Sequence, residues 1–182
     1  PPDAEGLVPA ERILEAIRPD TLAVSVMQVN NETGVIQPVA EIADGMEGQS
    51  AYLHVDAAQS FGKMMDELRS PRIDLISASS HKVYGPTGVG ALIARRRRYR
   101  RPPLEPLMRG GGQERGLRPG TLPTPLIAGF GLAAELAEKY HKARRERCLA
   151  IRRQALAALA PLGIRLHGNE GRLVPHVLNF SI

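Results

Sequence analysis

The chain has 182 residues, a formal net charge of +5 and a hydrophobic content of 43%, which is enough for one substantial core and part of a second. No apolar run is long enough to span a bilayer, and the first residues lack the basic and apolar regions of a signal peptide, so we expect no membrane association. A single cysteine excludes an internal disulfide framework and suits a reducing compartment, so we predict a cytoplasmic location.

The first half of the chain alternates helical patterns with apolar runs. Residues 10–17 have apolar positions at helical spacing and are stopped by Pro19, and residues 39–46 indicate a second short helix. The run at residues 21–29 is almost continuously apolar, which predicts a central strand covered on both faces. Strands that alternate with helices indicate βαβ units and a mainly parallel sheet, so we predict an α/β fold. Four apolar runs are expected to be strands, at residues 21–29, 51–55, 74–78 and 90–94.

The densest basic run, residues 95–101, follows the last of these strands. Such a run is either a solvated loop or a nucleic-acid-binding patch. We favour the loop, because aromatic side chains that could stack on bases make up 4% of the sequence. An acidic protein partner would use the same surface.

Polar residues follow three of the predicted strands. Asn30, Asp56 and Lys82 all lie where an apolar run has just ended, and the carboxyl ends of parallel strands meet at one edge of a sheet. A lysine amine can form an imine with a carbonyl, and the neighbouring Ser79 and His81 can hold a phosphate. A carboxylate such as Asp56 is the partner that a pyridinium nitrogen needs. Although a lysine after a strand is usually a solvated loop residue, this combination predicts a pyridoxal phosphate site, and we predict no metal site.

The second half of the chain begins with a glycine-rich loop and continues as a long helix. The loop, residues 109–121, combines a flexible backbone with arginines and Thr121, as anion-binding loops do, but lacks the ending of a Walker motif. Thr124 is the expected N-cap of a helix that continues to residue 159. The tail, residues 174–182, has the pattern of a strand.

Four segments together resemble the NifS-like cysteine desulfurases, a group within the class V aminotransferase family of pyridoxal phosphate enzymes. They are residues 24–34, 54–59, 79–86 and 110–121. The resemblance implies the large domain of a PLP-dependent transferase of fold type I, aspartate-aminotransferase-like, with a mainly parallel sheet. The domains it implies are residues 1–123 as part of the PLP-binding large domain, residues 124–160 as a helical connection, and residues 161–182 as the start of an incomplete small domain.

The same resemblance implies a role for each candidate residue. Lys82 would hold the cofactor as a Schiff base and shuttle protons, and Asp56 would keep the pyridinium nitrogen protonated. The other implied contacts are those of Asn30 and Gln59 with the phenolic oxygen, of Ser79 and His81 with the phosphate, and of Thr121 with the phosphate in the other subunit of a homodimer.

The implied activity is conversion of L-cysteine to L-alanine, with the sulfur passed as an enzyme persulfide to an acceptor protein. The resemblance places the catalytic cysteine loop beyond residue 182, so we predict that this stretch alone is inactive. Cys148 falls within a helical pattern, and we predict that it is a structural residue. Two alternatives remain: another class V enzyme, such as a selenocysteine lyase or an aminotransferase, and, more remotely, a basic nucleic-acid-binding domain.

Overall fold

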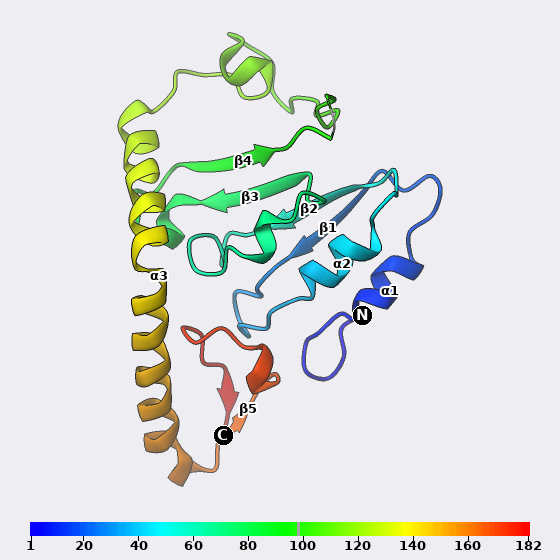
Figure 1. Cartoon of the computed structure of the whole chain (residues 1–182). Coiled ribbons are helices and arrows are strands. Elements are labelled where there is room, and N and C mark those ends of the chain that lie inside the picture. The colour runs from blue at the N-terminus through cyan, green and yellow to red at the C-terminus, as the bar shows by residue number, and fades with distance from the viewer. Residues whose placement is uncertain (98) are drawn as a thin grey trace.

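A four-stranded sheet forms the centre of the computed structural model, which describes residues 1–97 and 99–182 (Figure 1). The strand order is β1–β2–β3–β4, in which β1, β2 and β3 are parallel and β4 is antiparallel to β3. The predicted α/β fold with a mainly parallel sheet is confirmed. The strands are β1 (Ala23–Met27), β2 (Tyr52–Asp56), β3 (Leu75–Ser79) and β4 (Gly90–Ala94).

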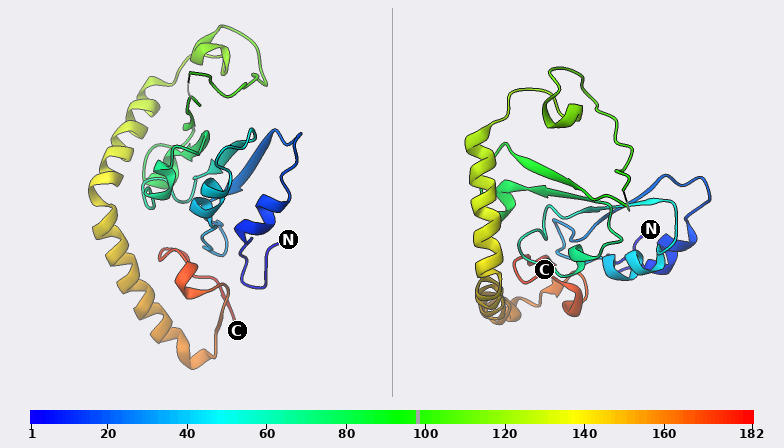
Figure 2. Two further views of the ribbon diagram at one scale, coloured as in Figure 1. Left: turned by 45° about the vertical axis from the view of Figure 1, so that its right-hand side comes forward. Right: turned by 45° about the horizontal axis from the view of Figure 1, so that its top comes forward.

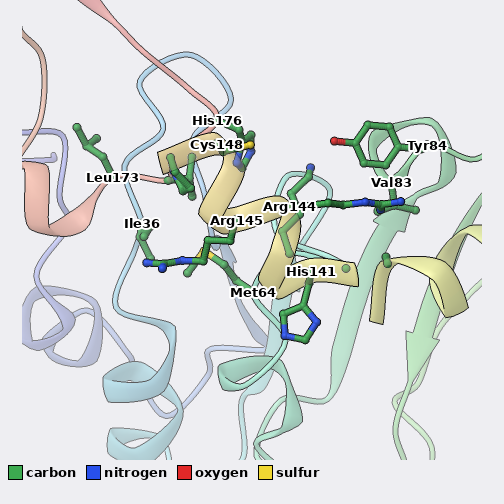
Figure 3. Close-up of a pocket in the computed structure, with 15 residues that line it drawn as sticks. Ile36, Met64, Val83, Tyr84, His141, Arg144, Arg145, Cys148, Leu173 and His176 are labelled. Carbon is green, nitrogen blue, oxygen red and sulfur yellow. The ribbon is translucent and has the colours of Figure 1, made fainter. Parts of the chain in front are cut away.

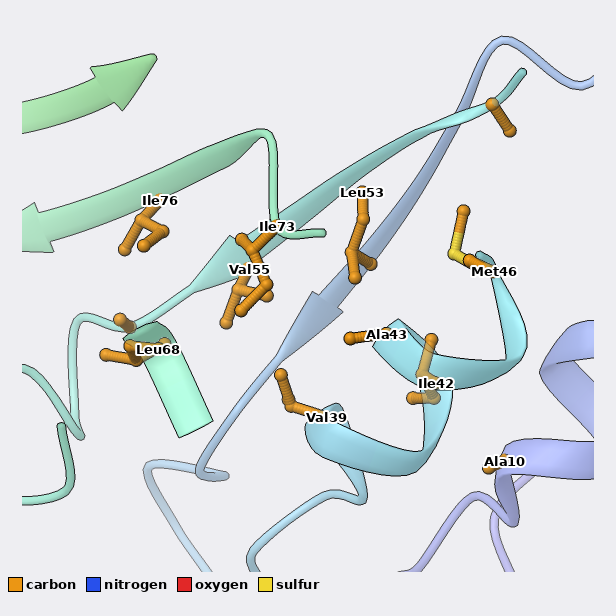
Figure 4. Packing of buried hydrophobic residues seen from close by; sticks show 12 residues of the cluster. Ala10, Val39, Ile42, Ala43, Met46, Leu53, Val55, Leu68, Ile73 and Ile76 are labelled. Atoms are coloured by element: carbon orange, nitrogen blue, oxygen red, sulfur yellow. The ribbon is translucent and has the colours of Figure 1, made fainter. Parts of the chain in front are cut away.

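Two short helices, α1 (Ala10–Glu15) and α2 (Val39–Gly45), belong to the core that covers one face of this sheet (Figure 4). The apolar residues of α2 recur at intervals of three and four, which places Ile42 and its neighbours on one side of the helix. Ile42 of α2 and Leu53 and Val55 of β2 have no exposed surface. Burial of one such side chain contributes about 1.5–3 kcal/mol, so this layer holds the parallel strands in register.

Strand β1 lies at an edge of the described sheet. Its residues alternate between half-buried and exposed, and Ala23, Ser25 and Met27 are the exposed ones. The prediction of a central strand covered on both faces is therefore wrong for the part of the chain that the structure describes. The helices α1 and α2 pack against the face that carries Val24 and Val26, and the opposite face carries Ser25 between the exposed residues Ala23 and Met27.

The connections around β3 are short. The crossover from β2 to β3 contains a 3₁₀ helix, η1 (Glu67–Arg69), in place of an α-helix. Another 3₁₀ helix, η2 (Ser80–Val83), begins directly after β3, and a third, η3 (Gln113–Gly116), lies in the loop that follows β4. The short η2 turn keeps residues 80–83 at the end of the sheet.

Helix α3 (Thr124–Leu159) has 36 residues and runs along the side of the molecule, past the carboxyl ends of the parallel strands (Figures 1 and 2). Its buried residues Phe130, Ala133 and Ala137 lie along one side. The predicted N-cap is wrong by one residue, because Pro123 occupies that position and Thr124 is already helical. Among the described residues, the structure contains no helix that is both long and apolar enough to cross a membrane.

The C-terminal segment returns to the turn after β1. It contains the 3₁₀ helices η4 (Ala160–Leu162) and η5 (Glu170–Arg172) and the antiparallel pair β5 (Arg165–Leu166) and β6 (Phe180–Ser181). The Val174 amide donates to the Gly34 carbonyl at 2.9 Å, and the Asn179 side chain donates to the Glu32 carbonyl at 3.1 Å. The strand predicted at residues 174–182 is thus limited to β6. The division into large and small domains stays a prediction.

Part of the basic run at residues 95–101 is built into the fold. The Arg97 guanidinium donates to both carboxylate oxygens of Asp74, at 3.1 and 2.7 Å. The Arg95 guanidinium donates to backbone carbonyls of the crossover before β3. The prediction of a solvated loop is therefore wrong for these two arginines, and Arg98 lies outside the described residues.

Candidate functional site

Six of the seven predicted site residues follow or end the parallel strands. Asp56 is the last residue of β2 and Ser79 is the last residue of β3, while Asn30 lies three residues after β1. Since these strands are parallel and adjacent, their carboxyl ends share one edge of the sheet. The six residues are Asn30, Asp56, Gln59, Ser79, His81 and Lys82.

The Asp56 carboxylate is half-buried and held in place by its own chain. Its Oδ1 atom accepts a hydrogen bond from the Ala58 amide at 2.9 Å, because β2 turns sharply after this residue. In the sheet, Asp56 lies opposite Met27 of β1 and Ser77 of β3. A carboxylate held in this way, with Oδ2 left for a second donor, can pair with a cationic ring nitrogen.

Ser79, His81 and Lys82 form a continuous polar segment at the end of β3. The Ser79 hydroxyl lies 3.0 Å from Nδ1 of His81, and His81 is exposed while Lys82 is half-buried. Tyr84 then ends η2 in a left-handed conformation, with φ of 69°. A hydroxyl and an imidazole held side by side beside an amine are suited to an anion such as a phosphate.

A second lysine lies beside this segment. The Lys63 ammonium donates to the Gln59 carbonyl at 3.0 Å. Burial, and then the positive charge of Lys82, lower the pKa of Lys63, while Cys148 opposes that shift. Lys63 also lines the same cavity as Val83, the residue that follows Lys82.

The Asn30 side chain closes the turn after β1. Its Oδ1 atom accepts from the amides of Glu32 and Thr33, both at 2.9 Å, which is the geometry of an Asx turn. The amide nitrogen Nδ2 is the atom that remains for a ligand, apart from a long contact of 3.7 Å with the Met27 sulfur. Asn30 can thus donate to an acceptor such as a phenolic oxygen.

Thr121 differs from the other six candidates. It is exposed and belongs to the loop between β4 and α3, which extends beyond β4 (Figure 1). Within the part of the chain that the structure describes, no hydrogen bond joins Thr121 to the other six residues. The Gln113 side chain orders this loop by accepting from the Gly120 amide at 3.0 Å. The contribution of Thr121 to a second subunit stays a prediction.

A cavity of about 100 Å³ lies next to the site, between α3, the turn after Gly62 and the C-terminal segment (Figure 3). Cys148 lines it from within α3, as its helical pattern predicts, and it is half-buried. His176 lines it from the C-terminal segment, and burial together with Lys63 lowers the pKa of His176 to about 4. A cysteine inside a continuous helix lacks the mobility of a loop, so the structural role of Cys148 remains our prediction.

A row of polar side chains, not predicted from the sequence, crosses the parallel strands. Ser25, His54 and Ser77 are joined by hydrogen bonds at 2.8 and 3.2 Å. A signal for this row exists in the sequence, since polar residues alternate with apolar ones near the end of each strand. Lys63 was also missed, and no local pattern distinguishes it from a solvated lysine.

Comparisons with known proteins identify the family. The aminotransferase class-V family matches residues 1–182. The mitochondrial cysteine desulfurase of Saccharomyces cerevisiae is 56% identical over 137 residues, which are 75% of this chain and 27% of that protein. The chain thus spans about a quarter of that relative.

Two solved structures have the same fold. DndA from Streptomyces lividans superposes with a TM-score of 0.94 and 51% identity, over 98% of this chain and 50% of that one. A structure described as SspA in complex with cysteine has a TM-score of 0.65 and 48% identity, over 74% of this chain and 38% of that one. The predicted fold class, that of PLP-dependent transferases of fold type I, is confirmed. The chain belongs to the class V aminotransferase family, and the relatives that it matches include cysteine desulfurases.

Proposed function

We propose that this chain is the central part of a pyridoxal phosphate-dependent cysteine desulfurase. The enzyme converts L-cysteine to L-alanine and passes the sulfur, as an enzyme persulfide, to an acceptor protein. The observation that carries the proposal is the placement of Asp56 and of Ser79, His81 and Lys82 at the ends of two adjacent parallel strands. The relatives named as cysteine desulfurases, and a related structure described as a complex with cysteine, support this substrate.

The residues at the carboxyl edge fit pyridoxal phosphate by the chemistry of their donors and acceptors. Lys82 supplies the amine for covalent attachment, and the neighbouring Ser79 and His81 supply donors for the phosphate. The Asp56 carboxylate, fixed by the Ala58 amide, pairs with the ring nitrogen. Asn30, through Nδ2, and Gln59 would contact the phenolic oxygen of the cofactor.

When bound, the cofactor supplies an electron sink that stabilises negative charge on the substrate carbon. Asp56 keeps the ring nitrogen protonated, which strengthens that sink, and Lys82 moves the proton at the substrate carbon. We further propose a homodimer in which Thr121 of each subunit reaches the phosphate bound by the other. A cytoplasmic location stays a prediction, since the yeast relative is described as mitochondrial.

The test uses the complete product of the gene that contains this chain. Purified protein with added pyridoxal phosphate is reduced with borohydride, and the labelled peptide is identified by mass spectrometry. We expect the cofactor mass on Lys82 and release of alanine and sulfide from L-cysteine. Lys82→Ala should lose the label and the visible absorption while it keeps the far-UV circular dichroism of the folded protein.

Lys63→Ala is the matched control, because Lys63 is a half-buried lysine beside the same site. It should keep a reducible label on Lys82. A label that survives in Lys82→Ala, or a protein that binds no pyridoxal phosphate, would contradict the proposal. A cofactor-loaded protein that forms no alanine from L-cysteine would instead indicate another class V reaction.

A further inference from the structure

A hydrogen-bonded row of three side chains crosses β1, β2 and β3. Nδ1 of His54 lies 2.8 Å from the Ser25 hydroxyl, and Nε2 lies 3.2 Å from the Ser77 hydroxyl. A hydroxyl can donate or accept, so either tautomer of the imidazole satisfies both contacts. The ring of His54 is therefore held at both nitrogens by residues of two different strands.

The row lies directly before the proposed cofactor residues. His54 precedes Asp56 by two positions, so the two side chains share a face of β2 and are separated by about 7 Å along the strand. In the register, His54 is opposite Leu75, whereas its hydrogen-bond partner Ser77 is opposite Asp56. The imidazole is therefore hydrogen-bonded to a residue whose backbone lies at the level of Asp56.

Strand alignment alone does not require this row. The other face of β2 carries Leu53 and Val55, which have no exposed surface, and a slip of one residue would expose both. Backbone hydrogen bonds also fix the strand ends, since the Ala57 amide donates to the Ser77 carbonyl at 2.9 Å. The three polar side chains on the opposite face are thus available for a role other than alignment.

We propose that His54 is a positioning residue for Asp56. In this proposal the imidazole, held by Ser77 on the same face of β2, restricts the conformation of the Asp56 side chain, so that Oδ1 keeps its hydrogen bond from the Ala58 amide and Oδ2 remains for the ring nitrogen. The inference rests on the proposed function, because it assumes that Asp56 pairs with that nitrogen. The two hydrogen bonds of His54 then differ in importance. The bond to Ser77 is needed to position Asp56, whereas the bond to Ser25 only holds the other nitrogen of the ring.

This inequality can be tested with variants that each remove one hydrogen bond. Ser77→Ala and Ser25→Ala make the same chemical change on neighbouring strands. His54→Gln places an amide near the position of Nε2 and can keep the bond to Ser77, whereas His54→Asn places it near Nδ1 and can keep the bond to Ser25. His141→Leu on α3 is a control for the loss of a histidine elsewhere.

The complete gene product is loaded with pyridoxal phosphate labelled with ¹⁵N in the ring, and the nitrogen chemical shift reports protonation. We expect His54→Leu and Ser77→Ala to shift this signal toward the neutral ring and to weaken cofactor binding about three- to tenfold, as loss of one hydrogen bond predicts. We expect the ¹⁵N shift and the cofactor affinity to stay close to those of the unmodified protein in Ser25→Ala, His54→Gln and His141→Leu. His54→Asn should show the same changes in both quantities as His54→Leu.

A purely structural role would lower the melting temperature of these variants and leave the ¹⁵N shift unchanged, and that result overturns the inference. Equal shifts in Ser25→Ala and Ser77→Ala overturn it as well. If His54→Leu does not fold, the comparison of the ¹⁵N shifts of Ser25→Ala and Ser77→Ala tests the inference by itself. If the unmodified protein binds no cofactor, the proposed function is wrong, and the inference is wrong with it. If Ser77→Ala binds the cofactor but its ¹⁵N shift is unchanged, the inference alone is wrong.

Discussion

Strands β3 and β4 pair residue for residue, yet their surroundings are opposite. In β3, Leu75 and Ile76 are buried, whereas every residue of β4 is exposed, including Leu92 at 52% and Ile93 at 38%. Both strands carry large apolar side chains, and both pair through backbone hydrogen bonds. The difference shows that hydrogen-bond pairing is enough to form a strand here, while the hydrophobic contribution to stability depends on the layer that covers it.

The exposed side continues beyond β4. Large apolar side chains on the following loop and on the outer side of α3 are also exposed, in contrast to the α1 and α2 side of the sheet. They are Leu107, Met108, Leu117, Leu122, Ile127 and Leu132. The side of the sheet that α1 and α2 cover is therefore well packed, whereas β4 and the loop after it, which carries Thr121, bury little apolar surface.

The largest expected effect on the free energy of unfolding comes from the ion pairs of Asp74, which connect the segments next to β3 and β4. Asp74 precedes β3 and accepts from Arg72 at 2.8 Å and from Arg97, which follows β4, at 2.7 Å. Asp74→Ala leaves the buried Arg72 guanidinium and the Leu53 amide without this partner. We expect the free energy of unfolding in urea to fall by about 3–5 kcal/mol.

The control for Asp74 is a surface pair. Arg69 and Glu138 are 3.1 Å apart with side chains 63% and 69% exposed, so Glu138→Ala should cost about 0–1 kcal/mol. Similar losses for Asp74→Ala and Glu138→Ala would show that the link between β3 and β4 is not buried in solution.

The second effect measures the contrast between covered and uncovered strands. Leu53 of β2 has no exposed surface, so Leu53→Ala should lower the free energy of unfolding by about 2–5 kcal/mol. Leu92→Ala makes the same change on β4 and should cost about 0.5 kcal/mol or less, because most of the side chain already contacts solvent. Equal costs in chemical denaturation would mean that another surface covers β4.

The smallest effect tests how α3 packs on the core. Gly62 has a φ of +72°, and a Cβ there would lie 2.7 Å from Cβ of Ala137 in α3. Gly62→Ala should therefore destabilise the protein by about 1–3 kcal/mol. Gly131→Ala, where an added Cβ has open space, should instead stabilise it by up to about 1 kcal/mol, because glycine weakens a helix. Equal melting temperatures for the two variants would contradict this packing.

Much of the fold could be predicted because its signals are local. The apolar runs that became β1 to β4, and the helical spacing of α3, depend on residues close together in the chain. The position of Asp56 and Lys82 at one edge followed as well, because strands joined by crossovers are parallel. The error at Thr124 was of the same local kind, since Pro123 shifted the helix start by one residue.

The sequence by itself therefore determined the family, the parallel strands and the residues at their carboxyl ends. Tertiary structure alone decided that β1 lies at an edge, that β4 is antiparallel and uncovered, and that Arg97 reaches Asp74. It also decided that His54 meets Ser25 and Ser77, which lie 29 and 23 positions away in the chain. The physical reason is that burial and side-chain hydrogen bonds depend on which segments pack together, and a pattern within one segment carries no information about its partner.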